Sequence, residues 1–179
     1  MQFKSLFFVV SIVAAAFAAH TVDDITAGLS KVDAAVTTLQ TGISSFPQNG
    51  GNMQQAMNVH NSVDDVVAAV EATLKVAVDI EGPVSVDDGK TILNIFHNMV
   101  PIINVGLNAV VEKKDALVSL GIGRAQAIIA LDLQHLLKAV VDLETSLLAI
   151  TPPECLDEAK TLAASVKASL DASIKVYVA

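Results

Sequence analysis

Residues 91–111 of the chain read TILNIFHNMVPIINVGLNAVV, and no position in this run carries a formally charged side chain. A run of this length is long enough to cross a membrane as a helix. On a helix that turns by about 100° per residue, however, its polar side chains fall within one arc of about 120°. These side chains are Asn94, His97, Asn98, Asn104 and Asn108. A helix surrounded by lipid would not keep such a stripe. The run therefore predicts an amphipathic helix of a bundle, and no transmembrane segment in the mature chain.

The opposite face of this helix is apolar and consists of Ile92, Ile95, Phe96, Met99, Ile103, Leu107 and Val110. Pro101 lies on the polar arc. Because a proline inside a helix removes a backbone hydrogen bond and crowds the preceding turn, we expect a kink there. The helix is expected to run from Ser85 to about Leu120, where glycines follow.

Four further segments carry apolar residues at helical spacing, and proline or glycine lies at each junction between segments. Thr21, Ser85 and Thr151 each stand three positions before an acidic residue, a pattern typical of a helix start. No segment alternates as a strand would. Since the connections are short, successive helices are expected to be neighbours. The sequence predicts an all-α bundle of about five long antiparallel helices, and the four further helices cover about residues 20–46, 52–80, 124–150 and 151–177.

Residues 1–18 predict a secretory signal peptide that the mature protein loses. Lys4 precedes an apolar stretch from Leu6 to about Val13, and Ala16-Phe17-Ala18 fits a cleavage site. The alternative, an N-terminal anchor helix, requires a longer apolar stretch. We therefore expect a single mature domain over residues 19–179 that is secreted and extracellular. The C-terminal residues lack the hydrophobic tail of a GPI signal.

The chain is both apolar and acidic, with 53% apolar residues and a formal net charge of -8. Because nucleic acids and anionic membranes attract basic surfaces, this charge argues against both as partners. Cys155 is the single cysteine, so no intramolecular disulfide can form. The thiol is expected either to be buried as a small apolar group or to form an intermolecular bridge.

The sequence has no pattern typical of an active site. It lacks the nucleophile, phosphate-loop and dinucleotide motifs, and no two of its four histidines stand three or four residues apart. His60 falls on the apolar stripe of its helix, where we expect a hydrogen-bonded residue in the core. The chain is therefore expected not to be an enzyme and to need no cofactor or metal ion.

The helix predicted over residues 124–150 has the widest apolar face. Such a helix either lies at the centre of the bundle or faces something apolar that is not protein. We predict that it faces the helix containing Pro101 across an apolar site for a fatty acid, another lipid or a hydrophobic surface. A cavity of several hundred Å³ between these two helices would favour this hypothesis. The predicted lining residues are Ile92, Ile95, Phe96, Met99, Ile103, Leu107, Leu133, Leu136, Leu137 and Val140.

Two alternatives fit the same sequence. A secreted interaction module, such as an effector or an inhibitor, would have a fully packed core and would bind a protein through its acidic outer face. Passive adsorption to a hydrophobic surface, by opening of the bundle, would need no preformed site.

Four segments of the chain carry a resemblance to known proteins. They are TVDDITAGLSKVDAAVTTL at 21–39, GPVSVDDGKTIL at 82–93, LNAVVEKKDAL at 107–117 and ASIKVY at 172–177. In this order they resemble the fungal hydrophobic surface-binding protein A family, which includes cell-wall galactomannoproteins. The resemblance implies an all-α bundle secreted by a fungus that binds hydrophobic surfaces. Some members of the family hold a fatty acid between the helices, and some recruit a secreted hydrolase, so the resemblance makes both expectations for this chain. The chain lacks the Ser/Thr-rich tail of the mannoproteins, which weakens an expectation of association with the cell wall.

Overall fold

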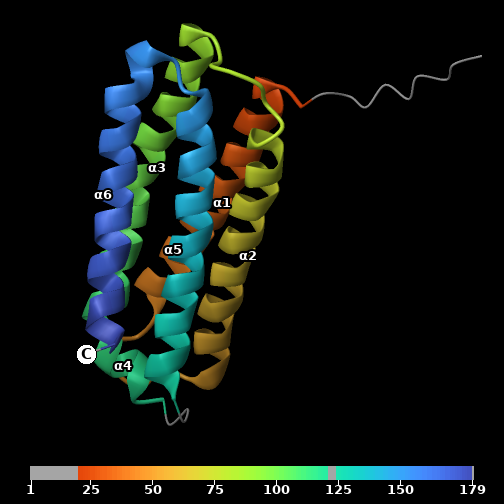
Figure 1. Ribbon diagram of the computed structural model, residues 1–179. Coiled ribbons are helices and arrows are strands. Elements are labelled where there is room, and N and C mark those ends of the chain that lie inside the picture. The colour runs from red at the N-terminus through yellow and green to blue at the C-terminus, as the bar shows by residue number, and fades with distance from the viewer. Residues whose placement is uncertain (1–19, 121–123, 179) are drawn as a thin grey trace, which may run out of the picture.

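The computed structural model describes residues 20–120 and 124–178, so the predicted signal peptide lies outside the described residues. This part of the chain forms five long helices and one short helix, without a strand. The all-α bundle that the sequence predicts is therefore confirmed. The helices are α1 (Val22–Ser45), α2 (Met53–Ala77), α3 (Val86–Glu112), α4 (Lys114–Val118), α5 (Ala125–Ile150) and α6 (Pro153–Val178) (Figure 1).

The five long helices form a closed ring, and none of them lies at its centre. Around the ring, α1 packs against α2, α2 against α5, α5 against α6, α6 against α3, and α3 against α1. Each long helix therefore turns one apolar face inward. Of the two positions considered for the very apolar α5, the structure excludes the centre of the bundle.

Helix direction alternates along the chain, so α1, α3 and α6 run one way and α2 and α5 the other (Figure 1). The pairs α1–α2 and α5–α6 are antiparallel neighbours, as expected. The expectation that all successive helices are neighbours is wrong for α2–α3 and α3–α5, which do not pack along their lengths. The α2–α3 connection instead passes the end of α5, where the backbone N–H of Val84 donates to the Ile150 carbonyl (2.8 Å).

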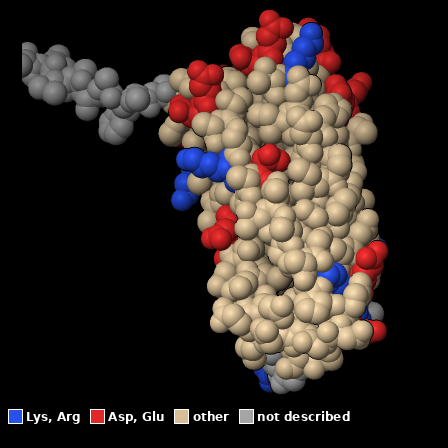
Figure 2. Space-filling view, turned by 180° about the vertical axis from the view of Figure 1, so that it is seen from behind, with Lys and Arg blue, Asp and Glu red and all other residues tan. Residues whose placement is uncertain are grey.

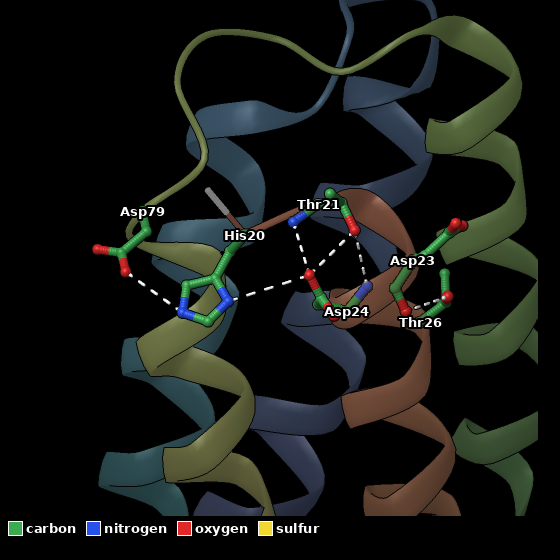
Figure 3. Close-up of polar contacts among 6 residues, drawn as sticks. All are labelled: His20, Thr21, Asp23, Asp24, Thr26 and Asp79. Carbon is green, nitrogen blue, oxygen red and sulfur yellow. Dashed lines mark hydrogen bonds and ion pairs between the residues drawn. The ribbon is translucent and has the colours of Figure 1, made fainter. Parts of the chain in front are cut away.

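The start of α1 is held by the capping interaction that the sequence predicts (Figure 3). The Thr21 hydroxyl accepts a hydrogen bond from the Asp24 N–H (3.4 Å), and the Asp24 carboxylate accepts one from the Thr21 N–H (2.8 Å). The bonds that the Asp24 carboxylate accepts, from the Thr21 N–H and from the Thr21 hydroxyl (3.0 Å), hold the pKa of Asp24 below its ordinary value. His20 Nε2 lies 3.6 Å from Asp79, just after α2, and so links the cap to the neighbouring helix.

The start of α6 differs from the prediction. Thr151 does not cap α6, because its hydroxyl donates back to the Leu147 carbonyl in α5 (2.7 Å) and α6 begins at Pro153. Gly89 of α3 lies against this turn, where an added Cβ would come within 2.7 Å of Pro152 Cγ and 3.2 Å of Cys155 Sγ. The Cys155 thiol is free and buried, which is the first of the two environments expected for it.

The helix predicted to reach Leu120 ends at Glu112, and α4 closes that end of the ring. In α4, Leu117 belongs to a small apolar cluster with Phe46, the buried residue that follows α1. The Lys113 ammonium, between α3 and α4, donates to the carbonyls of Ser44 (2.7 Å) and Phe46. The last carbonyls of a helix have no partner within the helix. Lys113 therefore caps α1 and ties α4 to it.

Replacing this lysine tests the closure of the ring. Lys113→Met keeps an unbranched side chain of similar length but leaves both carbonyls without their donor in a buried place. We expect the free energy of unfolding in urea to fall by about 1–3 kcal/mol. The control is Lys175→Met at an exposed position of α6, which should change stability by less than about 0.5 kcal/mol. Equal losses in the two variants would contradict the capping role.

Candidate functional site

The ring encloses an apolar cavity of about 110 Å³, which we call the central cavity. Each of the five long helices contributes to its wall, and most of the wall consists of Val, Leu and Ile side chains. A second cavity of about 40 Å³, the side cavity, lies between α3, α5 and α6. Phe96, Glu144 and Val166 line both cavities, and these three side chains therefore stand between them.

Most of the predicted lining residues lie on the wall of the central cavity. Ile92 lines the side cavity instead, and Ile95 and Leu137 line neither, although both pack against the core. Because α3 and α5 are not neighbours, their residues meet across the cavity and not at a direct helix interface. The predicted residues that line the central cavity are Phe96, Met99, Ile103, Leu107, Leu133, Leu136 and Val140.

The share of the wall that comes from α1, α2 and α6 was not predicted from the sequence. The apolar stripes of α1 and α2 were visible, but helical spacing does not tell which stripes share one cavity. In α6, Val166 and Leu170 reach the same wall. The apolar contributions of α1 and α2 are Leu29, Val32, Val36, Leu39, Ile43, Val59, Val63, Val66 and Val70.

Polar side chains on the central wall are few, and they are Gln40, Asp132 and Glu144. Asp132 already has a partner, because His60 Nδ1 of α2 lies 2.8 Å from its Oδ2 and so joins α2 to α5. This hydrogen bond raises the pKa of His60. The histidine is hydrogen-bonded as expected, but its side chain is 34% exposed and so lies at the rim of the bundle, not in the core.

Glu144 was also missed, although the sequence holds a signal for it. It occupies a position within the apolar stripe of α5, four residues after Val140 and three before Leu147. Burial raises the pKa of its carboxyl group to about 7, and the positive charge of Lys167 on α6 only partly offsets this. Within the described part of the chain, no residue forms a hydrogen bond or ion pair with that carboxyl group.

The outer surface has a group of large exposed apolar side chains, which we call the exposed apolar patch: Met53, Met57, Ile128 and Leu131. They belong to the first two turns of α2 and of α5, which are parallel neighbours. The contact between His60 and Asp132 sets the two helices in register, so Met57 and Ile128 lie one turn below it at the same level.

Charged residues are unevenly spread over the surface. Seen from behind, acidic side chains gather at one end of the bundle and a broad area is free of charge (Figure 2). Residues 34–63 and 91–111, in α1, α2 and α3, contain no Lys, Arg, Asp or Glu. Parts of three neighbouring helices thus present neutral side chains to the solvent, although the chain as a whole is acidic.

None of the helices in the described residues combines the length and apolarity that crossing a membrane requires. No cluster of His, Cys, Asp or Glu side chains in residues 20–120 and 124–178 could hold a metal ion.

Comparison with known proteins places the chain in a group that shares this fold. The family model described as hydrophobic surface binding protein A matches residues 22–149. No curated protein matches the chain in sequence. A solved structure of ligand binding domain 1 of the Penicillium marneffei MP1 protein, complexed with arachidonic acids, is 20% identical with a TM-score of 0.78, and the match covers 87% of this chain and 97% of that one.

Two further structures match as well. AFMP4P in complex with palmitic acid is 20% identical with a TM-score of 0.79, over 88% of this chain and 99% of that one. Ligand binding domain 2 of the same MP1 protein, complexed with multiple arachidonic acids, is 14% identical with a TM-score of 0.77, over 88% and 96% of the two chains. At such identities these likenesses establish a common fold.

The hydrogen bond between His60 of α2 and Asp132 of α5 should make the free energy of unfolding depend on pH. In the folded protein the pKa of His60 is raised above its ordinary value of 6.5. Its bond to Asp132 is therefore fully stabilising below about pH 6.5 and is lost as the pH rises through the folded pKa. We expect His60→Gln to lower the free energy of unfolding more at about pH 6 than at about pH 8.5. A loss independent of pH, or an equal pH dependence in the exposed control His135→Gln, would rule this out.

Proposed function

Because this chain belongs to the hydrophobic surface binding protein A family, we propose that it is a secreted, non-catalytic protein that holds a fatty-acid-like lipid in its central cavity. The observation that carries the proposal is the cavity itself, an apolar space enclosed by five helices. Secretion rests on the predicted signal peptide at residues 1–18. Association with a cell wall, or with a secreted hydrolase, rests on the family resemblance.

The solved structures with this fold support a lipid as the ligand. Those proteins were solved in complex with arachidonic or palmitic acid, and their structures align with most of this chain. An alkyl chain in the central cavity would leave water for a wall of Val, Leu and Ile side chains. Each buried methylene contributes about 0.8 kcal/mol, from which the cost of ordering the chain is subtracted.

The size of the central cavity limits how a lipid can bind. Its volume of about 110 Å³ falls below the several hundred Å³ expected of a ligand pocket. A long chain therefore requires the ring to widen, and no disulfide holds the helices together, because Cys155 is free. Movement of the three side chains between the central and side cavities would join the two spaces. We propose that the ring widens in this way as the lipid enters.

The alternative of an interaction module with a fully packed core is disfavoured by the cavity. Adsorption to a hydrophobic surface has an observation of its own, the exposed apolar patch. We propose this patch, which lies beside the uncharged part of α2, as the contact with an uncharged hydrophobic solid. The two modes use different residues, and variants can separate them.

Filling the central cavity should abolish lipid binding. In Val140→Phe the larger side chain occupies space that the ligand needs, and Val36→Phe fills the cavity from the opposite side. The assay is native mass spectrometry of protein that has been extracted with organic solvent and then incubated with fatty acids and, separately, with long-chain alcohols. The matched control is Val105→Phe, at a position of α3 that is 52% exposed. Lipid retained by both cavity variants, or no lipid bound by the native protein, would refute binding in this cavity. Circular dichroism verifies the fold, because overpacking costs about 1–3 kcal/mol.

Removing the exposed apolar patch should reduce adsorption and leave lipid binding intact. The double variant Met57→Gln/Leu131→Gln replaces two exposed apolar side chains of the patch with neutral polar ones. We expect weaker retention on polyester film, with an unchanged lipid signal in mass spectrometry. The control, Val78→Gln/Val105→Gln, makes two similar changes at exposed positions outside the patch. Equal retention of the two double variants would show that the patch has no special role.

A further inference from the structure

We propose that Glu144 binds the polar head of the ligand, and that it selects amphiphiles whose head donates a hydrogen bond, such as long-chain alcohols, over carboxylates of the same length. This inference rests on the proposed function, because it concerns the ligand of the central cavity. It names a head-group class that the cavity accepts and one that it rejects.

The position of Glu144 suits a head group. Together with Phe96 and Val166 it lines both cavities, so its side chain stands where the central cavity ends. One turn away along α5, on either side, Val140 and Leu147 are apolar. An alkyl tail in the larger central cavity would therefore bring its polar end to Glu144, the one polar group at this junction.

The carboxyl group of Glu144 is available for such a contact. The Glu144 side chain is half-buried, and no described residue donates a hydrogen bond to its carboxyl group. This partial burial raises the pKa of the carboxyl group to about 7. A ligand hydroxyl that donates to this carboxyl group would supply the missing partner, whether the carboxyl group is ionised or not.

A ligand carboxylate, by contrast, would find no counter-ion. No Lys, Arg or His of the described residues lines either cavity. Lys167, the cation whose charge acts on Glu144, has its Nζ 2.6 Å from Asp171 Oδ2.

His60, which contacts the wall residue Asp132, is shared between Asp132 and Asp64, at 2.8 and 3.8 Å. Two carboxylates close together, out of water and without a free cation, disfavour each other's ionised form. A carboxylate head beside Glu144 is therefore unfavourable once both groups are ionised.

The test compares dodecan-1-ol with dodecanoate at about pH 8.5, where both Glu144 and the ligand carboxyl are largely ionised. Protein freed of lipid is loaded with the neutral dye N-phenyl-1-naphthylamine, and each compound displaces the dye. Any apolar cavity disfavours a charged head, so the preference of the native protein for the alcohol does not decide the matter by itself. The decisive readout is the effect of variants on each compound.

Glu144→Gln removes the charge and keeps an acceptor, so dodecanoate should bind about tenfold more tightly, the factor that corresponds to one pKa unit. The alcohol should bind only slightly less tightly, because an amide oxygen is a weaker acceptor than a carboxylate. Glu144→Met removes the charge and the acceptor. It should admit dodecanoate in the same way and lose about tenfold or more in affinity for the alcohol, the value of one hydrogen bond to a charged group. The control is Glu81→Gln, which removes the same charge from the exposed α2–α3 connection.

The outcomes separate the inference from the proposed function. If dodecanoate binds Glu144→Gln and Glu81→Gln equally well, the head-group role of Glu144 is wrong, while lipid binding in the cavity stands. If neither compound displaces the dye from the native protein, both proposals fail. Melting temperatures measured without ligand verify that the variants are folded.

Discussion

The constraint on which this structure depends is the packing of five helices around one axis. Packed helices lie about 8–10 Å apart. In a regular ring of five, each helix axis is then about 7–8.5 Å from the centre, whereas in a ring of four it is closer. The inner positions are mainly Val, Leu and Ile, and aromatic side chains are rare in this chain. The inward-facing side chains therefore leave part of the space along the axis empty. A ring with an odd number of helices also cannot alternate direction throughout, and the pairs α1–α3, α3–α6 and α2–α5 are parallel.

An open ring would let water into this space, and both of its ends are covered. At one end Lys113 caps α1 and α4 packs its Leu117 against Phe46. The backbone at Gly51 packs closely against the Phe46 side chain, and a Cβ at Gly51 would lie 2.4 Å from the Phe46 aromatic ring. At the other end the α2–α3 connection passes the end of α5 and bonds to it through Val84. The connections therefore help to enclose the cavity as well as to join the helices.

The polar groups on the wall differ in what they can do. Asp132 is satisfied by His60, and their bond serves the packing of α2 on α5. Glu144 is half-buried and has no such partner among the described residues, and Lys167, whose charge acts on it, is already paired with Asp171. Partial burial disfavours the charged form of an acid that has no partner. This is a physical reason to look for the function of Glu144 in the ligand.

Local pattern determined much of this protein by itself. The spacing of apolar residues identified the five long helices, the Thr21–Asp24 pair identified the start of α1, and the asparagine stripe of residues 91–111 distinguished an amphipathic helix from a membrane span. The stripes also identified Phe96, Met99, Leu133 and Leu136 as inward-facing. Tertiary structure alone decided which helices are neighbours, because a stripe shows that a face is buried but not against which partner. For this reason α1 and α2 were missed as walls of the cavity, and α3 and α5 proved to lie across it from each other. The role proposed for Glu144 also depends on tertiary structure. An acid in an apolar stripe becomes a candidate binding group only when the helix ring places it between two cavities.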